Sequence, residues 1–174
     1  HRPGLQYHFT VVDSPEINAF ALPGGYIYIT RGILAYLNSE AELAAVLGHE
    51  TGHVTARHSV QQLSAATAAQ VGATLLGLFV PALRNQAGDT AINLLGTVLL
   101  SGYGREHELE ADRLGAEYLY RTQYDPQAML KVLGVLKNQE LFDAEVAKAE
   151  GRQPRSYHGV FASHPDADQR LQEV

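Results

Sequence analysis

The chain has 174 residues, 45% hydrophobic and 18% charged, which fits one globular domain with its own core and excludes a disordered chain. Its formal net charge is -6 and its pI is near 5.7, so non-specific nucleic-acid binding, which needs a basic surface, is not expected. Because the chain has no cysteine, disulfide frameworks and cysteine-ligated zinc sites are also excluded.

The first part of the chain predicts a small sheet. Residues 5–12 have the composition of a short strand. Two apolar runs, residues 18–22 and 26–30, flank a Pro-Gly-Gly turn and predict a β-hairpin. Residues 31–37 predict a short helix or a turn.

A long helix is expected from about residue 40 to residue 58. Ser39 and Glu42 stand three residues apart in a capping-box pattern at its start. The apolar residues that follow recur at helical spacing.

The middle of the chain is unusually apolar. Residues 71–83 and 92–100 are apolar runs separated by a polar segment, and both are shorter than the ~20 residues that a transmembrane helix needs. We predict an apolar helical hairpin over about residues 64–101, inserted into a single domain of residues 1–174. The hairpin is either a pair of core helices or a surface that contacts a membrane or an assembly partner.

The last part of the chain predicts further helices. Residues 106–122 form one, and another starts at Asp125-Pro126, with the aspartate as cap and the proline in the first turn, and runs to about residue 142. Residues 149–163 contain glycine and proline and predict a long loop. Residues 165–174 predict a short closing helix.

The segment His49-Glu50-Thr51-Gly52-His53 matches the H-E-x-x-H motif within the long predicted helix. Residues four apart lie on one face of a helix, so both imidazoles can bind one Zn²⁺ at ~2.0–2.1 Å. Glu50 is then placed to act as general base toward the attacking water. The alternative is a surface helix with scattered charges, but apolar residues flank the motif too closely for an exposed face.

A catalytic zinc site needs a third protein ligand and an open position. Residues 105–112 are dense in candidate donors, and their spacing alone does not select one. Glu108 and Asp112, four apart, form the favoured pair: Glu108 as ligand, and Asp112 accepting a hydrogen bond from a ligand histidine or transferring a proton. Glu106 and Glu110 are expected to be solvated or paired with a neighbouring arginine. The alternative for the favoured pair is a charged surface stripe.

Together these residues resemble a known family. His49-Glu50-x-x-His53 followed by Glu108-x-x-Ala111-Asp112-x-x-Gly115 is similar to the gluzincin zinc metallopeptidases, the family of HtpX, the CaaX prenyl proteases and the periplasmic BepA-type proteases. Further similar segments are residues 18–25, residues 30–32, Ser163-His164-Pro165 and Arg170-Leu171. The resemblance covers residues 12–171.

The resemblance implies one Zn²⁺ per chain, endopeptidase activity, a zincin-like fold and Glu108 as the third ligand. The expected fold class is α+β, with a small, mostly antiparallel sheet packed on a central H-E-x-x-H helix. Because the apolar runs are shorter than the spans of integral members, the chain is placed nearer the exported branch. The implied location is extracytoplasmic: the bacterial periplasm or a membrane surface.

Three further sets of residues are candidates for roles at the site. His164 is a candidate inhibitory fourth ligand, and its alternative is a loop-anchoring histidine that never reaches the metal. Arg170 is a candidate for stabilising the developing oxyanion, or an ordinary helix-capping partner. An edge strand in the hairpin would bind an extended substrate through its backbone; its candidate residues are Asn18, Ala19, Phe20 and Ala21. The histidines at positions 1, 8, 58, 107 and 158 show no usable pattern and are expected to be surface or structural residues rather than ligands.

The expected function is hydrolysis of peptide bonds in unfolded or misassembled exported proteins, because backbone recognition reads few side chains. A competing hypothesis is a module that binds client proteins or assembly partners while the peptidase is held off. It draws on His164, the 149–163 loop and the apolar hairpin. A zinc-stabilised structural domain is the weaker third alternative, since structural sites are closed by four ligands.

Overall fold

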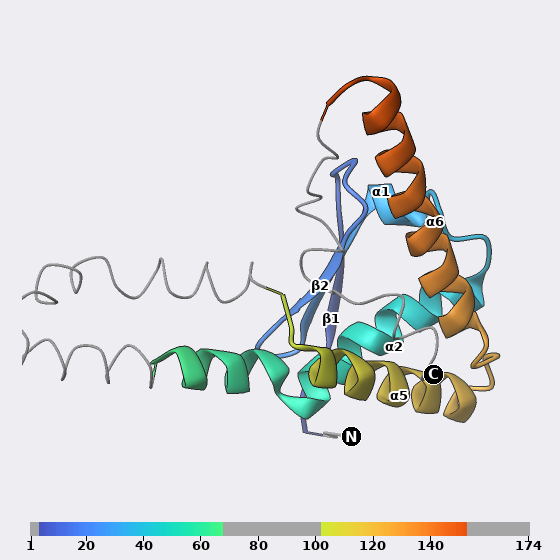
Figure 1. The fold of residues 1–174 in the computed structure, drawn as a ribbon. Helices are drawn as coiled ribbons and strands as arrows, with labels where there is room; N and C mark the ends of the chain where they lie inside the picture. Colours follow the sequence, from blue (N-terminus) through green and yellow to red (C-terminus); the bar gives the residue numbers. More distant parts are fainter. Residues whose placement is uncertain (1–3, 68–101, 153–174) are drawn as a thin grey trace, which may run out of the picture.

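The computed structural model describes residues 4–67 and 102–152 (Figure 1). Its elements are β1 (His8–Val12), β2 (Ala19–Leu22), β3 (Tyr26–Thr30), α1 (Arg31–Leu34), α2 (Glu40–Ala56), α5 (Arg105–Arg121) and α6 (Ala128–Ala149). Residues 58–67 are also helical. The α+β class is therefore confirmed. Most of the predicted 64–101 hairpin, the closing helix at 165–174, His164 and Arg170 lie outside the described residues.

The sheet has the order β1-β3-β2 and is mixed. β2 and β3 form the predicted antiparallel hairpin. Its turn requires glycine: Gly24 and Gly25 have φ of +99° and +93°, and a Cβ at Gly25 would collide with the carbonyl oxygen of Gln6.

The prediction of a mostly antiparallel sheet is wrong, because β1 pairs with β3 in parallel. β1 and β2 run in opposite directions but are not neighbours, because β3 lies between them. β3 is antiparallel to β2 and therefore parallel to β1.

The long helix α2 starts as the capping pattern predicts. The Ser39 hydroxyl accepts a hydrogen bond from the Glu42 backbone N–H at 3.2 Å. The Glu42 carboxylate in turn accepts from the backbone N–H of Asn38 at 2.7 Å, one residue earlier than in the standard capping box. The helix ends at Ala56, where Arg57 adopts a left-handed φ of +62°.

Helix α6 is longer than predicted. The sequence predicts an end near residue 142, whereas the helix continues to Ala149. Residues 143–149 are rich in alanine, glutamate and lysine, which favour helix, and no glycine or proline stands between residue 142 and Gly151. Gly151 has a φ of +65°, and the Arg152 N–H donates a hydrogen bond to the Ala147 carbonyl at 3.0 Å, which caps the C-terminus of the helix.

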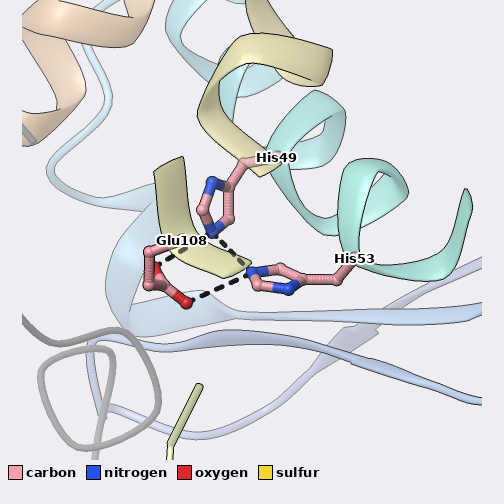
Figure 2. Close-up of side chains that lie close together, drawn as sticks. All are labelled: His49, His53 and Glu108. Carbon is pink, nitrogen blue, oxygen red and sulfur yellow. Dashed lines mark hydrogen bonds and ion pairs between the residues drawn. The ribbon is translucent and has the colours of Figure 1, made fainter. Parts of the chain in front are cut away.

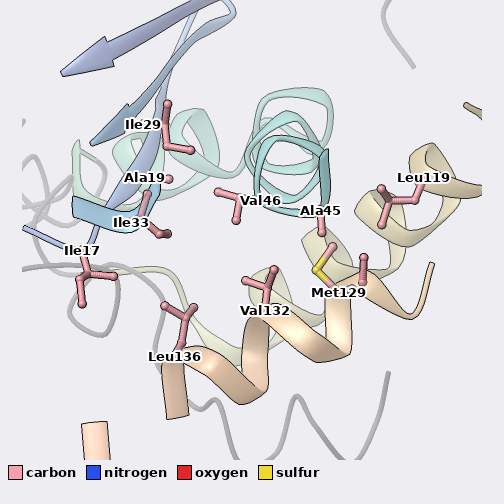
Figure 3. Packing of buried hydrophobic residues seen from close by; sticks show 11 residues of the cluster. Ile17, Ala19, Ile29, Ile33, Ala45, Val46, Leu119, Met129, Val132 and Leu136 are labelled. Atoms are coloured by element: carbon pink, nitrogen blue, oxygen red, sulfur yellow. The ribbon is translucent and has the colours of Figure 1, made fainter. Parts of the chain in front are cut away.

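The core places α2 at the centre of the fold. α2 contacts β2, β3, α5 and α6. The main cluster of buried residues unites the sheet, α1, α2, α5 and α6 (Figure 3): Ile17, Ala19, Ile29, Ile33, Ala45, Val46, Leu119, Ala128, Met129, Val132 and Leu136. A smaller cluster joins Ala21 and Ile27 of the hairpin to Val54 of α2. Within the described ranges, no helix is both long enough and apolar enough to cross a membrane.

Candidate metal centre

The site is built on an unusually close contact between α2 and α5, which lie side by side in Figure 1. A Cβ at Gly52 would lie 2.9 Å from the carbonyl oxygen of Ala111 and 3.0 Å from its Cα. One turn earlier, a Cβ at Gly48 would lie 3.3 Å from the carbonyl oxygen of Gly115. Because small residues face each other at both levels, the two backbones approach closely, and longer side chains beside the contact reach one another.

Three of those side chains converge: His49 and His53 from α2, and Glu108 from α5 (Figure 2). The two Nε2 atoms are 3.0 Å apart. The Glu108 oxygens lie 3.3 Å from His53 Nε2 and 3.6 Å from His49 Nε2. Ligand atoms at ~2.0–2.1 Å around a tetrahedral zinc ion would be roughly 3.3–3.4 Å apart, so these separations fit one ion.

Asp112 lies beside the ring of His49, the first histidine of the motif. Its Oδ1 lies 2.8 Å from His49 Nδ1, and both side chains are buried. A carboxylate accepts, so His49 carries its proton on Nδ1 and directs the lone pair of Nε2 toward Glu108. This is the tautomer that a metal ligand needs.

The charge of the site also fits a cation. Glu108 and Asp112 are both 0% exposed, and Glu50, next to His49 on α2, is 1% exposed. Buried carboxylates are costly unless they are paired or coordinate a metal. Two imidazoles and a carboxylate are a donor set of catalytic zinc sites, so these residues fit a divalent ion of that kind.

Tyr103, for which the sequence offered no signal, covers one ring of the site. Its ring stacks on His53 with centroids 4.0 Å apart, and its hydroxyl is 2.6 Å from the Ser59 hydroxyl. Burial raises the pKa of Tyr103 to about 12, and the charges of Glu50 and Glu108 add to the rise. The phenol is therefore neutral at physiological pH, and both carboxylates lie near it.

His58 is the second residue that the sequence reasoning missed. It is 0% exposed, and its Nδ1 lies 2.8 Å from Nδ1 of His53. Its Nε2 lies 3.2 Å from the carboxylate of Glu110, which is exposed to solvent as expected but pairs with this histidine rather than with an arginine. The signal in the sequence was a histidine five residues after His53, just where the predicted helix ends.

The candidate substrate residues lie at an edge of the sheet. Ala19 and Ala21 bury their side chains against the rest of the fold. The backbone of Asn18 is held by Thr30, whose N–H donates to the Asn18 carbonyl at 3.0 Å. Among the described strands, β2 pairs with β3 and with no other.

Residues 1–174 match the model of peptidase family M48. The chain is 34% identical over 178 residues to the Beta-barrel assembly-enhancing protease of Escherichia coli (strain K12), covering 97% of this chain and 34% of that protein. It is 33% identical over 171 residues to the Mitochondrial metalloendopeptidase OMA1 of Schizosaccharomyces pombe, covering 98% of this chain and 46% of that protein. The chain thus spans between a third and a half of the length of these curated relatives.

Proposed function

The chain belongs to peptidase family M48, and from this premise we propose that it hydrolyses peptide bonds in proteins, with one Zn²⁺ held by His49, His53 and Glu108. The observation that carries the proposal is the convergence of these three buried side chains from two helices. A zincin-like arrangement is part of the proposal, supported by the contacts of α2 with both the hairpin strands and α5.

When bound, zinc lowers the pKa of water and polarises a carbonyl group. The protein's own residues supply the proton transfer. We assign the role of general base to Glu50: its carboxylate takes a proton from the attacking water and passes it to the leaving amine. Asp112 holds His49 in the required tautomer, as its 2.8 Å bond to Nδ1 supports.

An extended substrate would add to the edge of β2. Asn18 and Thr30 form a hydrogen-bonded pair of the antiparallel ladder, in which hydrogen-bonded and non-hydrogen-bonded pairs alternate. Ala19 and Ala21 therefore belong to non-hydrogen-bonded pairs, and their backbone N–H and C=O groups point away from β3. Ala21 packs in the same cluster as Val54, the residue after His53, which relates this edge to the metal-binding helix. Ala21→Pro removes one outward N–H and should raise KM without changing zinc affinity. An unchanged KM would count against this binding mode.

Unfolded or misassembled exported proteins are the substrates that such backbone recognition suits. For location we propose the bacterial periplasm or a membrane surface, supported by the family resemblance. The names of the two relatives refer to β-barrel assembly in a bacterium and to mitochondria in a yeast. Cell fractionation of the natural protein tests the location.

The proposal is tested by zinc content and casein cleavage, measured on the same preparations. Glu50→Gln should keep zinc and lose cleavage by at least about 100-fold, as expected for loss of a general base. Glu108→Ala should lose zinc and cleavage, while Glu106→Ala, an exposed carboxylate on the same helix, should keep both. Wild-type cleavage by Glu50→Gln would overturn the assigned mechanism.

The client-binding alternative depends on His164, residues 149–163 and the 64–101 hairpin, nearly all of which lie outside the described residues. The same variant separates it from the peptidase: if Glu50→Gln retains every cellular role of the protein, binding is the main function.

A further inference from the structure

The position of His58 depends on a break in the helix. In an uninterrupted helix, residue 58 would lie about 140° around the axis from residue 53, and the two rings would not face each other. Arg57 interrupts the helix with its left-handed φ of +62°, and helical structure resumes at residue 58. The break turns the His58 ring back toward the metal-binding helix, to 2.8 Å from His53.

The hydrogen bonds around His58 imply which atom donates and which accepts in each of them. A histidine that holds a metal ion through Nε2 carries its proton on Nδ1. His53 would therefore donate from Nδ1 to Nδ1 of His58. His58 must then carry its own proton on Nε2, and this atom lies 3.2 Å from the acceptor oxygen of Glu110.

The two contacts of His58 require one ring nitrogen that accepts and one that donates. The ring is 0% exposed and stacks on His107 with centroids 4.3 Å apart. A neutral ring can accept on one nitrogen and donate from the other, whereas a charged ring could only donate.

We propose that His58 is a positioning residue of the metal centre, which accepts the Nδ1–H of His53 and is itself oriented by Glu110. The inference rests on the proposed zinc site. It makes the two ligand histidines unequal. His49 bonds directly to the carboxylate of Asp112, whereas His53 bonds to the neutral imidazole of His58, which in turn bonds to the carboxylate of Glu110.

The first test compares two variants of the 174-residue chain by chelator competition for zinc. His58→Leu removes the acceptor, and zinc affinity should fall by about 10–100-fold. His58→Asn places an amide oxygen near the former Nδ1, so it should keep affinity within a few-fold of wild type. His8→Asn, at an exposed site on β1, controls for loss of a histidine. Equal zinc affinity in His58→Leu and wild type would overturn the proposal.

Thermal melting of the metal-free variants separates positioning from general stability. A role in packing alone would lower the melting temperature of both His58 variants without separating their zinc affinities, and this pattern would also refute the proposal. The expected pattern is that zinc affinity follows the presence of an acceptor, whatever the melting temperatures.

The second test needs no variant. Ring ¹⁵N NMR of the zinc-loaded wild-type chain should show His58 as the neutral tautomer protonated on Nε2. A proton on Nδ1, or a charged ring, would contradict the proposed direction even if every variant failed to fold. A wild-type chain that takes up no zinc would refute the proposed function itself, whereas zinc uptake with the wrong tautomer refutes only the role of His58.

Discussion

Gly52→Ala should weaken the metal centre more than it weakens the fold. The added Cβ would meet the Ala111 carbonyl oxygen at 2.9 Å and its Cα at 3.0 Å, whereas ordinary contacts begin near 3.4 Å. Both neighbours are backbone atoms, so no side chain can rotate away. The two helices must therefore separate by about half an ångström, as the difference between these distances indicates.

The effect on stability is expected to be modest because two contributions oppose each other. Overpacking costs about 1–3 kcal/mol, and replacing glycine with alanine within a helix returns about 1 kcal/mol. The free energy of unfolding should therefore fall by roughly 0–2 kcal/mol. Zinc binding is more sensitive, because ligand distances must hold within about 0.2 Å and the separation moves Glu108 relative to both histidines. Zinc affinity should fall by about tenfold or more.

Urea unfolding of the metal-free chain and chelator competition for zinc measure the two effects separately. Gly134→Ala, in α6, is the matched control, because its added Cβ would meet none of the described atoms within 4 Å. It should leave zinc affinity unchanged and raise stability by up to about 1 kcal/mol. If Gly52→Ala binds zinc as tightly as wild type, the close helix contact does not set the ligand geometry.

Three further predictions concern one backbone conformation and two hydrogen bonds. Asp112→Ala leaves the Nδ1–H of His49 without its carboxylate, so zinc affinity in a chelator competition should fall about 10–100-fold; an unchanged affinity would contradict its orienting role. Arg57→Val, which disfavours a left-handed φ, should destabilise the chain by about 1–2 kcal/mol in urea unfolding, whereas Arg57→Gly should not; equal losses would point to the side chain instead. The Tyr124 hydroxyl donates to Glu40 at 2.6 Å, and this bond raises the pKa of Tyr124. Its contribution to stability is present below pH 10 and lost as pH rises through the raised pKa, and Glu40→Gln should return that pKa toward 10 in an NMR titration.

Local features of the fold were predictable because they depend on neighbours in the sequence. The capping residues at positions 39 and 42 place the start of α2 at Glu40. The Pro-Gly-Gly turn joins β2 to β3 as expected. The parallel partner of β1 was not predictable, because no local pattern says that β3 inserts between β1 and β2.

For the candidate site, the sequence by itself determined that His49 and His53 share one helix face and that Glu108 and Asp112 share another, since both pairs are four residues apart. It did not determine, by spacing, which carboxylate of residues 105–112 meets the histidines.

The tertiary structure decided that question through the contact of Gly52 with Ala111, which sets the rotation of α5 against α2 and turns Glu108 and Asp112 toward the histidines. It likewise decided the place of His58 through one left-handed residue at the end of α2. Helical periodicity is local and can be read from residue spacing. The packing of one helix on another depends on atoms that are distant in the chain, so only the folded structure shows which side chains meet.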